Sequence, residues 1–170
     1  MNFAEPEGEH MVYIGRFPSP HRAVVHVPVG RRIPIFCSST GRAYLSGLPD
    51  AEIKQILQNL DRPKFTSYTV TDVEAIFEMI LKVRETGFAY SIEEFYLNDL
   101  TFAAPIQNIW GIPVASLNIS VSTAYWSYER AVEELVPKLI HTATLISTRP
   151  PTMRALEPFQ IGYKKIKPDL

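Results

Sequence analysis

The chain has little cysteine, no long apolar run and no signal peptide. Its 170 residues include one cysteine, Cys37, which cannot form an internal disulfide or build a metal site alone. No window approaches the ~18 apolar residues of a membrane-spanning helix. The polar, acidic residues 1–10 lack the apolar core that a signal peptide needs. These absences predict a cytoplasmic protein, in a reducing compartment, that does not associate with membranes.

The chain also has no surplus of basic charge. Lys and Arg number 17 against 18 Asp and Glu, which gives a net charge of −1 and a pI of about 6.4. Nucleic-acid-binding domains usually carry a basic face or a high pI. The histidines lack the sequence spacing of metal ligands; they are His10, His21, His26 and His141. The sequence therefore predicts no bound metal and no cofactor.

What the chain does have is the apolar content of one folded domain. Hydrophobic residues make up 46% and charged residues 21% of the sequence. Strands are predicted over residues 11–17, 23–29, 88–90, 101–107 and 112–121. Helices are predicted within residues 36–47, and from about residues 50, 71 and 127 onward. This order indicates an α+β domain with an antiparallel sheet.

Several short signals refine these elements. Thr71 and Glu74 have the spacing of a capping box, and Gly87 stands where a left-handed residue would end the same helix. Pro137 lies inside the last predicted helix and should bend it. Residues 108–111 (NIWG) predict a hairpin turn between the last two strands.

Three consecutive hydroxyl residues stand immediately before the first predicted helix. They are Ser38, Ser39 and Thr40, and Gly41 follows them. Ser and Thr are good N-cap residues. A helix start also offers free backbone N–H groups and the positive end of the helix dipole, which together bind carboxylate or phosphate. The segment supports two interpretations, a plain helix cap and an anion cradle, and its residues alone leave both open.

The strand over residues 112–121 alternates between apolar and small polar residues. One face carries the apolar side chains and the other carries Ser116, Asn118 and Ser120. The neighbouring strand repeats the small face with Thr101, Ala103 and Pro105. A solvated face is the commoner fate of an antiparallel sheet. Two adjacent strands with matching small faces nevertheless favour a concavity, so both a pocket and a plain surface remain open.

Signals for catalysis are weak. A nucleophilic set would need Ser38 or Ser39 beside a histidine, and no G-x-S-x-G motif surrounds either serine. Glu93 and Glu94 are adjacent on an extended segment, so their side chains point in opposite directions and do not form an acid–base pair. Loop anchoring or an interface role is the prediction for them. The sequence predicts no catalytic residues and no enzymatic activity, with a Ser-dependent hydrolase as the alternative.

Taken in order, these segments resemble the effector-binding domain of the IclR (isocitrate lyase regulator) family of bacterial transcription regulators. The resemblance runs over about residues 11–148 and rests on the order and spacing of its motifs rather than on any one of them. The motifs are Pro34–Leu45 (PIFCSSTGRAYL), Gly87 with Glu93-Glu94, Ala103–Ile106 (AAPI), Gly111–Ser120, and Leu135–Pro137 (LVP).

The resemblance implies a GAF-like fold: a curved antiparallel sheet with helices packed on one side and a ligand pocket on the other. It implies a small-molecule effector, most often an organic and in some cases aromatic acid, which favours the anion cradle. It also implies a homodimer or homotetramer whose subunit arrangement the effector shifts, so controlling DNA binding by a winged helix-turn-helix domain. The implied effector-binding residues are Ser38, Ser39, Thr40, Gly41, Ser91, Asp99, Thr101, Asn118 and Ser120.

Three positions depart from the family pattern. Ser91 stands where members often carry an acidic residue, and Asn98 where they often carry glycine. Asp99 stands where an apolar residue is usual. An ionised Asp99 facing the pocket would repel a second carboxylate and favour a hydroxyl or amine on the ligand. A position in solvent, the usual place of aspartate, is the alternative.

The domain boundaries follow from these assignments. Residues 1–10 are predicted to be a linker, residues 11–148 the effector-binding domain and residues 149–170 a C-terminal arm. The first ten residues cannot form a DNA-binding domain, so the chain is expected to be an effector domain cut from a longer regulator that contacts DNA through a domain absent here. A free-standing GAF-like sensor and a structural oligomerisation module are the alternatives.

Overall fold

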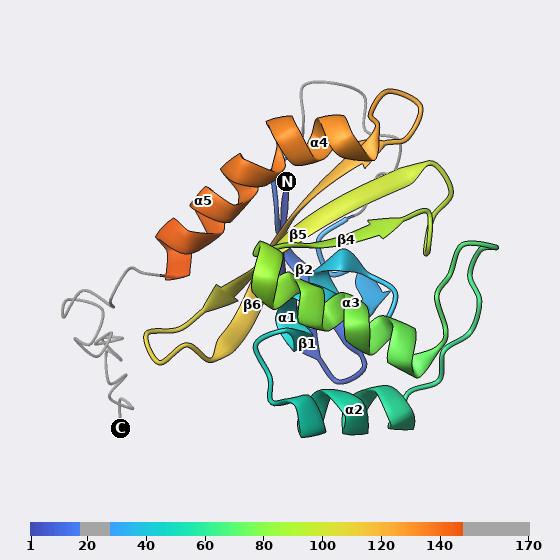
Figure 1. Ribbon diagram of the computed structural model, residues 1–170. Helices are drawn as coiled ribbons and strands as arrows, with labels where there is room; N and C mark the ends of the chain where they lie inside the picture. The colour runs from blue at the N-terminus through green and yellow to red at the C-terminus, as the bar shows by residue number, and fades with distance from the viewer. Residues whose placement is uncertain (18–27, 148–170) are drawn as a thin grey trace, which may run out of the picture.

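The computed structural model describes residues 1–17 and 28–147 (Figure 1). The strands are β1 (Asn2–Glu7), β2 (His10–Arg16), β3 (Arg32–Pro34), β4 (Ala89–Ile92), β5 (Asp99–Gln107) and β6 (Pro113–Ser122). The helices are α1 (Ser39–Leu45), α2 (Asp50–Asn59), α3 (Val73–Thr86), α4 (Tyr128–Glu134) and α5 (Val136–Ser147). Within the described ranges, no helix is both long and apolar enough to cross a membrane.

The strands form one antiparallel sheet in the order β3-β2-β1-β6-β5-β4. The β5–β6 hairpin closes as predicted, with the Asn108 N–H donating to the Ile112 carbonyl at 2.9 Å. Gly111 adopts φ 76°, a left-handed conformation that glycine reaches without strain. β6 pairs on its other edge with β1, where Asn118 stands opposite Asn2.

The position of β1 corrects one domain boundary. The prediction that residues 1–10 form a linker is wrong, because residues 2–7 form a strand that pairs with β2 on one edge and β6 on the other. The backbone N–H and C=O groups on both edges of residues 2–4 therefore find partners inside the sheet. Pro6 and Gly8 among charged residues resemble a loop composition, and that composition concealed the strand.

Helices cover both faces of the sheet (Figure 1). On one face, α4 and α5 bury side chains against Phe102, Ala104 and Leu117. On the other face, Ala103 packs with Ala43 of α1 and Val83 of α3. The predicted fold class, an α+β domain with a curved antiparallel sheet, is confirmed. The prediction of helices on one side only is corrected, because Thr101 and Ala103 are buried on one face of β5 as Phe102 and Ala104 are on the other, and each buried face needs a covering layer.

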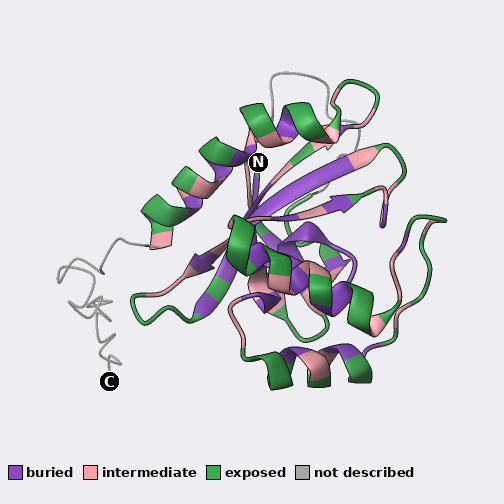
Figure 2. Ribbon diagram, viewed as in Figure 1, coloured by how far each residue is buried: buried purple, intermediate pink, exposed green. Residues whose placement is uncertain are grey.

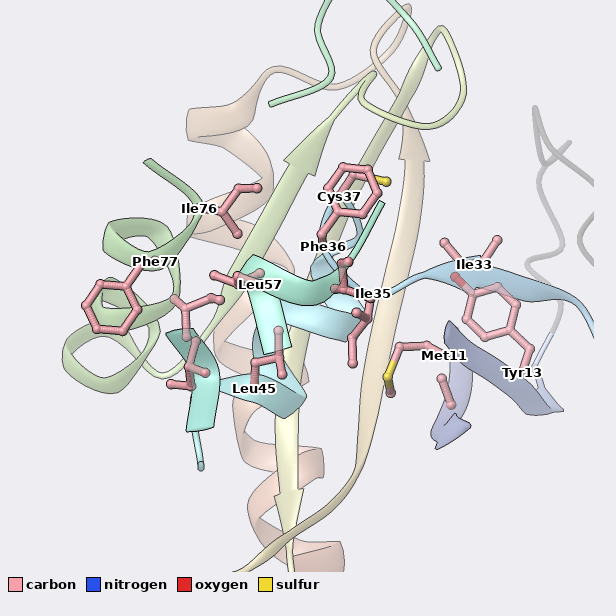
Figure 3. Close-up of a cluster of buried hydrophobic side chains, with 14 residues drawn as sticks. Met11, Tyr13, Ile33, Ile35, Phe36, Cys37, Leu45, Leu57, Ile76 and Phe77 are labelled. Atoms are coloured by element: carbon pink, nitrogen blue, oxygen red, sulfur yellow. The ribbon is translucent and has the colours of Figure 1, made fainter. Parts of the chain in front are cut away.

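A second core lies between α2, α3 and the segment leading into α1, and Figure 3 shows its side chains. Ile35 precedes α1 and Leu45 is its last residue, while Leu57 of α2 and Ile76 of α3 pack into the same cluster. Figure 2 shows the inward sides of α2 and α3 buried and their outer sides exposed. This packing fixes residues 35–37, which follow β3, and so sets where α1 begins.

The predicted helix ends differ in detail from those observed. The N-cap of α3 is Asp72, one residue after the predicted Thr71, and its carboxylate accepts the Ala75 N–H at 2.9 Å. Gly87 ends α3 in the left-handed conformation, as predicted. The last helix divides into α4 and α5 rather than bending, and Pro137 lies in the first turn of α5, where its missing N–H removes no helical hydrogen bond.

The strand predicted over residues 23–29 falls mainly outside the described residues, and the arm predicted over residues 149–170 falls wholly outside them.

Candidate functional site

The hydroxyl run is a helix cap in the first instance. Ser38 is the N-cap of α1, and its hydroxyl accepts the Gly41 N–H at 3.1 Å while donating to the Pro34 carbonyl at 2.8 Å. Thr40, fully buried, donates its hydroxyl to the Ser38 oxygen at 3.2 Å. The side chains of Ser38 and Thr40 therefore stabilise the start of α1, which weakens the hydroxyl part of the predicted anion cradle.

Gly41 has a packing role. A Cβ atom at this position would lie 1.9 Å from the Ile35 carbonyl oxygen, far inside van der Waals contact. Only glycine lets α1 approach the segment before it this closely. Gly41 thus shapes the site by positioning α1, and it does not line the cavity described next.

A cavity of about 70 Å³ lies beside the start of α1, between the sheet and the loop that joins β4 to β5. Six of the nine predicted site residues line it: Ser38, Ser39, Ser91, Asp99, Thr101 and Ser120. Thr40, Gly41 and Asn118 do not. Lining residues that the sequence analysis did not single out as ligand contacts include Tyr13, Arg16, Glu93, Glu94 and Tyr96.

A chain of hydroxyl groups forms one wall of this cavity. Ser39 donates to the Thr101 hydroxyl at 2.9 Å, and Thr101 donates to the Ser91 carbonyl at 3.4 Å. Ser91 in turn donates to the Cys37 carbonyl at 3.0 Å. Each of these oxygens still has a lone pair for a ligand donor. Burial raises the pKa of the Cys37 thiol to about 12, so the thiol stays neutral and unreactive.

Asn118 supports the site from behind. It is fully buried, its side-chain carbonyl accepts from the Asn2 amide at 3.0 Å, and its amide donates to the Tyr13 hydroxyl at 3.0 Å. The Tyr13 hydroxyl accepts this bond, so its own proton is available to a ligand. Burial, with the nearby Asp99 charge, raises the pKa of Tyr13 and keeps it a donor. The alternation of Met11 and Tyr13 in β2 was the sequence signal for this inward position.

Two of the acidic residues at the cavity are engaged by the protein. Glu94 forms a buried bidentate pair with Arg42 at 2.5 and 2.7 Å and also accepts the Val70 N–H at 3.1 Å. Glu93 accepts the Asn98 N–H at 2.6 Å. These contacts hold the β4–β5 loop over the cavity, which supports the anchoring role predicted for the two glutamates.

Asp99 faces the cavity, which answers the question that its sequence position left open. It is half-buried, and its Oδ1 atom accepts the Ser120 hydroxyl at 2.5 Å. Burial raises its pKa to about 6, against the smaller opposing effect of the Ser120 hydrogen bond. A carboxylate thus lines the cavity on the same face of β5 as the Thr101 hydroxyl.

A family model described as "Bacterial transcriptional regulator IclR C-terminal" matches residues 1–148. The chain belongs to this family. The match confirms the resemblance drawn from the sequence, and it identifies the chain as an IclR-family effector-binding domain. The match includes residues 1–10, in agreement with the place of β1 in the sheet.

Individual relatives agree with this assignment. The chain is 30% identical over 135 residues to the HTH-type transcriptional regulator KdgR of Escherichia coli (strain K12), an alignment that covers 79% of this chain and 51% of KdgR. A putative transcriptional regulator, RHA06195 of Rhodococcus sp. RHA1, superposes with a TM-score of 0.81 at 34% identity, covering 86% of this chain and 59% of that one. This IclR-family chain spans about half the length of the curated relatives it matches.

One similar structure contains a ligand. It is a double mutant of the inducer-binding domain of the PobR transcription factor from Acinetobacter, in complex with 3-hydroxybenzoic acid. The IclR-family domain described here superposes on it with a TM-score of 0.78 at 25% identity, covering 86% of each chain.

The alternative of a Ser-dependent hydrolase has no support in this IclR-family domain. The Ser38 and Ser39 hydroxyls donate to the Pro34 carbonyl and the Thr101 hydroxyl. Across residues 1–17 and 28–147, neither serine bonds to a histidine, which a nucleophilic serine requires. The relatives are transcriptional regulators rather than enzymes.

Asp99→Asn should stabilise the IclR-family domain at neutral pH and not in acid. A carboxyl whose pKa rises on folding contributes stability below its unfolded pKa, near 3.8, and loses it as the pH rises through about 6. A rise of about two pKa units corresponds to at most about 3 kcal/mol. We expect Asp99→Asn to gain about 1–3 kcal/mol of unfolding free energy at pH 7.5 in urea titrations, and this gain to vanish near pH 4. A gain that is equal at both pH values would contradict the ionisation of the half-buried Asp99.

Proposed function

We propose that this IclR-family domain binds a small carboxylic acid in the cavity beside α1 and reports that acid to a transcription regulator. The observation that carries the proposal is the cavity, where polar groups from β1, β2, β5, β6 and the start of α1 converge. Most of the residues predicted to contact an effector line it. The 3-hydroxybenzoic acid bound to the PobR domain is one acid of the proposed class.

Several donors around the cavity suit a carboxylate. The Tyr13 hydroxyl accepts from Asn118 and keeps its proton for a ligand. The Tyr96 hydroxyl accepts from Arg31 at 2.7 Å and keeps its proton in the same way. Arg16 adds a positive charge to the lining. These groups supply hydrogen-bond donors and positive charge for a carboxylate, of which the capped start of α1 provides only a part.

The binding event is proposed to act through subunit arrangement. In a regulator of two or four copies, an acid that binds one arrangement more tightly shifts the population toward it and so moves the DNA-binding domains. The exposed hairpin residues Ile109, Trp110 and Ile112 give an apolar surface for a contact between copies. DNA contact belongs in this proposal to another part of the regulator, and the place of action is the bacterial cytoplasm.

Thermal unfolding against a panel of aliphatic and aromatic carboxylic acids tests the proposal. An acid at about 100 times its dissociation constant adds about 2.7 kcal/mol of stability. For a domain of this size, we expect the midpoint to rise by roughly 5–10 °C. The rise should follow the logarithm of the acid concentration, as mass action requires.

Two tyrosine variants test whether the acid binds in the cavity beside α1. Tyr13→Phe removes the cavity hydroxyl and should weaken binding about 10-fold or more, because hydrogen bonds to charged groups are the stronger ones. Tyr68→Phe removes an exposed hydroxyl that does not line the cavity and should leave the response unchanged. Each shift is measured from the variant's own midpoint. An absence of any acid response would favour a structural oligomerisation module, and an equal response of both variants would exclude this cavity.

A further inference from the structure

The three acidic side chains that line the cavity differ in how the protein satisfies them. The Glu94 carboxylate is neutralised by the Arg42 guanidinium and accepts a backbone N–H. The Glu93 carboxylate accepts the Asn98 N–H and the Thr123 hydroxyl. Both groups hold the β4–β5 loop: Glu94 uses both of its carboxylate oxygens for these contacts, and Glu93 uses its Oε1 atom.

Asp99 has fewer partners than either glutamate. Over the described residues, its carboxylate receives one side-chain hydrogen bond, from the Ser120 hydroxyl, and forms no ion pair with Lys or Arg. One hydroxyl satisfies a fraction of the roughly four lone-pair sites of a carboxylate. Its remaining acceptor capacity lies at the cavity, because Asp99 and Ser120 both line it.

A charge of this kind has no evident structural use. It joins no helix cap and no ion pair in the described part of the chain, and burying it opposes folding at neutral pH. Groups that reduce stability at a cavity wall are typical of binding sites, where a ligand supplies the missing partner.

We propose that Asp99 determines effector specificity by accepting a hydrogen bond from a hydroxyl group on the acid. The effector is then a monocarboxylic hydroxy acid, with its carboxylate near Tyr13 and Arg16 and its hydroxyl at Asp99. This inference rests on the proposed function, since it assigns the second polar group of the same ligand. It also excludes dicarboxylic acids, because a second carboxylate in contact with Asp99 meets like charge in a partly desolvated site.

The affinity that a ligand loses when it lacks the hydroxyl group sets the size of the expected effect. A polar site built to hydrogen-bond a ligand hydroxyl discriminates strongly against analogues that lack it, since its own group is left unpaired. Hydrogen bonds to charged groups correspond to about 10- to 100-fold in affinity. Asp99 should therefore separate ligands that differ only at this one substituent.

Two matched ligand series test the proposal by isothermal titration calorimetry at pH 8, where Asp99 is ionised. The aromatic series is benzoate, 3-hydroxybenzoate and isophthalate, and the aliphatic series is propanoate, 3-hydroxypropanoate and succinate. Within each series one position carries hydrogen, hydroxyl or carboxylate. In the series that fits the cavity, we expect the hydroxy acid to bind about 10-fold or more tighter than the parent acid, and the diacid to bind more weakly than the parent.

Variants of Asp99 test whether this residue causes the preference for the hydroxy acid. Asp99→Leu should reduce the hydroxyl preference to less than about 3-fold, and the nearly isosteric Asp99→Asn should remove the penalty against the diacid. Asp61→Asn, an exposed position outside the cavity, is the control and should keep the wild-type order. Asp99→Asn preserves shape, so the test stands if Asp99→Leu fails to fold.

The outcomes separate this inference from the proposed function. Acids that bind without a hydroxyl preference, or a preference that persists unchanged in Asp99→Leu, would overturn the role of Asp99 and leave the acid sensor intact. Tight binding of a diacid to the wild type would overturn it equally. If no member of either series binds at millimolar concentration, the proposed acid sensor fails, and the inference fails with it.

Discussion

Gly41→Ala should unfold the domain or destabilise it by about 4 kcal/mol or more, the range reached when a core position is badly overpacked. The added Cβ would stand 1.9 Å from the Ile35 carbonyl oxygen and 2.6 Å from the Ile35 carbonyl carbon, and both are backbone atoms that no rotamer change can move. α1 would have to shift away from residues 33–37, opening the core that they share and the cavity wall. Urea unfolding followed by circular dichroism measures the loss.

Gly15→Ala is the matched control. A Cβ at Gly15 in β2 would lie 3.4 Å from the Phe3 Cβ atom, an ordinary contact, and alanine suits a strand at least as well as glycine. We expect its unfolding midpoint within a few degrees of the wild type. A folded Gly41→Ala with wild-type stability would show that α1 does not approach Ile35 as closely as described.

Glu94→Gln should lower the unfolding free energy by about 3–5 kcal/mol, since it leaves the buried Arg42 guanidinium without its counter-charge. The pair joins α1 to the β4–β5 loop, and both side chains are almost completely buried. The same loop is tied to residues 66–70 by the Thr69 hydroxyl, which donates to the Glu94 carbonyl at 2.6 Å. For this chain length, the loss corresponds to a fall of roughly 10 °C or more in thermal midpoint.

The control for Glu94→Gln is Glu134→Gln. Glu134 pairs with Arg130 at 2.8 Å on the exposed side of α4, and solvent screens such pairs, so its midpoint should hardly move. The double variant Arg42→Met/Glu94→Leu should recover part of the lost unfolding free energy, because it replaces the unpaired buried Arg42 charge with two apolar side chains. Equal, small effects of Glu94→Gln and Glu134→Gln would contradict the burial of the Arg42–Glu94 pair.

Local signals in the sequence predicted local structure well. Ser38 before an apolar helix, Gly87 after one and the alternation of residues 112–121 all act through neighbours a few positions away, where the physical rule is strong. The order of such elements was enough to predict the α+β fold class, and the family followed from the resemblance of sequence motifs and their spacing. The same alternation pointed to the face on which Thr101 and Ser120 line the cavity.

Contacts between distant segments were missed. β1 is held by pairing of Asn2 with Asn118, 116 positions away, and no local pattern in residues 1–10 signals it. Asp99 shares the face of Thr101 on β5, but whether that end of the face is enclosed or open to solvent depends on how the β4–β5 loop folds over the sheet. Thr40 and Gly41 do not line the cavity, because the Thr40 hydroxyl bonds to Ser38 and the Gly41 backbone packs closely against Ile35. A sequence motif predicts which segments form the site, whereas the three-dimensional packing decides which residues of those segments face a ligand.

The most direct test of the acid-binding cavity is a two-dimensional ¹H–¹⁵N NMR titration with the panel acid that raises the unfolding temperature most. If the acid binds in this cavity, we expect the largest amide shifts on Ser39, Ser91, Asp99, Thr101 and Ser120, and we expect them to saturate with a single dissociation constant. Largest shifts at the separate groove between α3 and β4, lined by Thr86, Phe88 and Ala89, would contradict it, as would the failure of every acid to shift any amide.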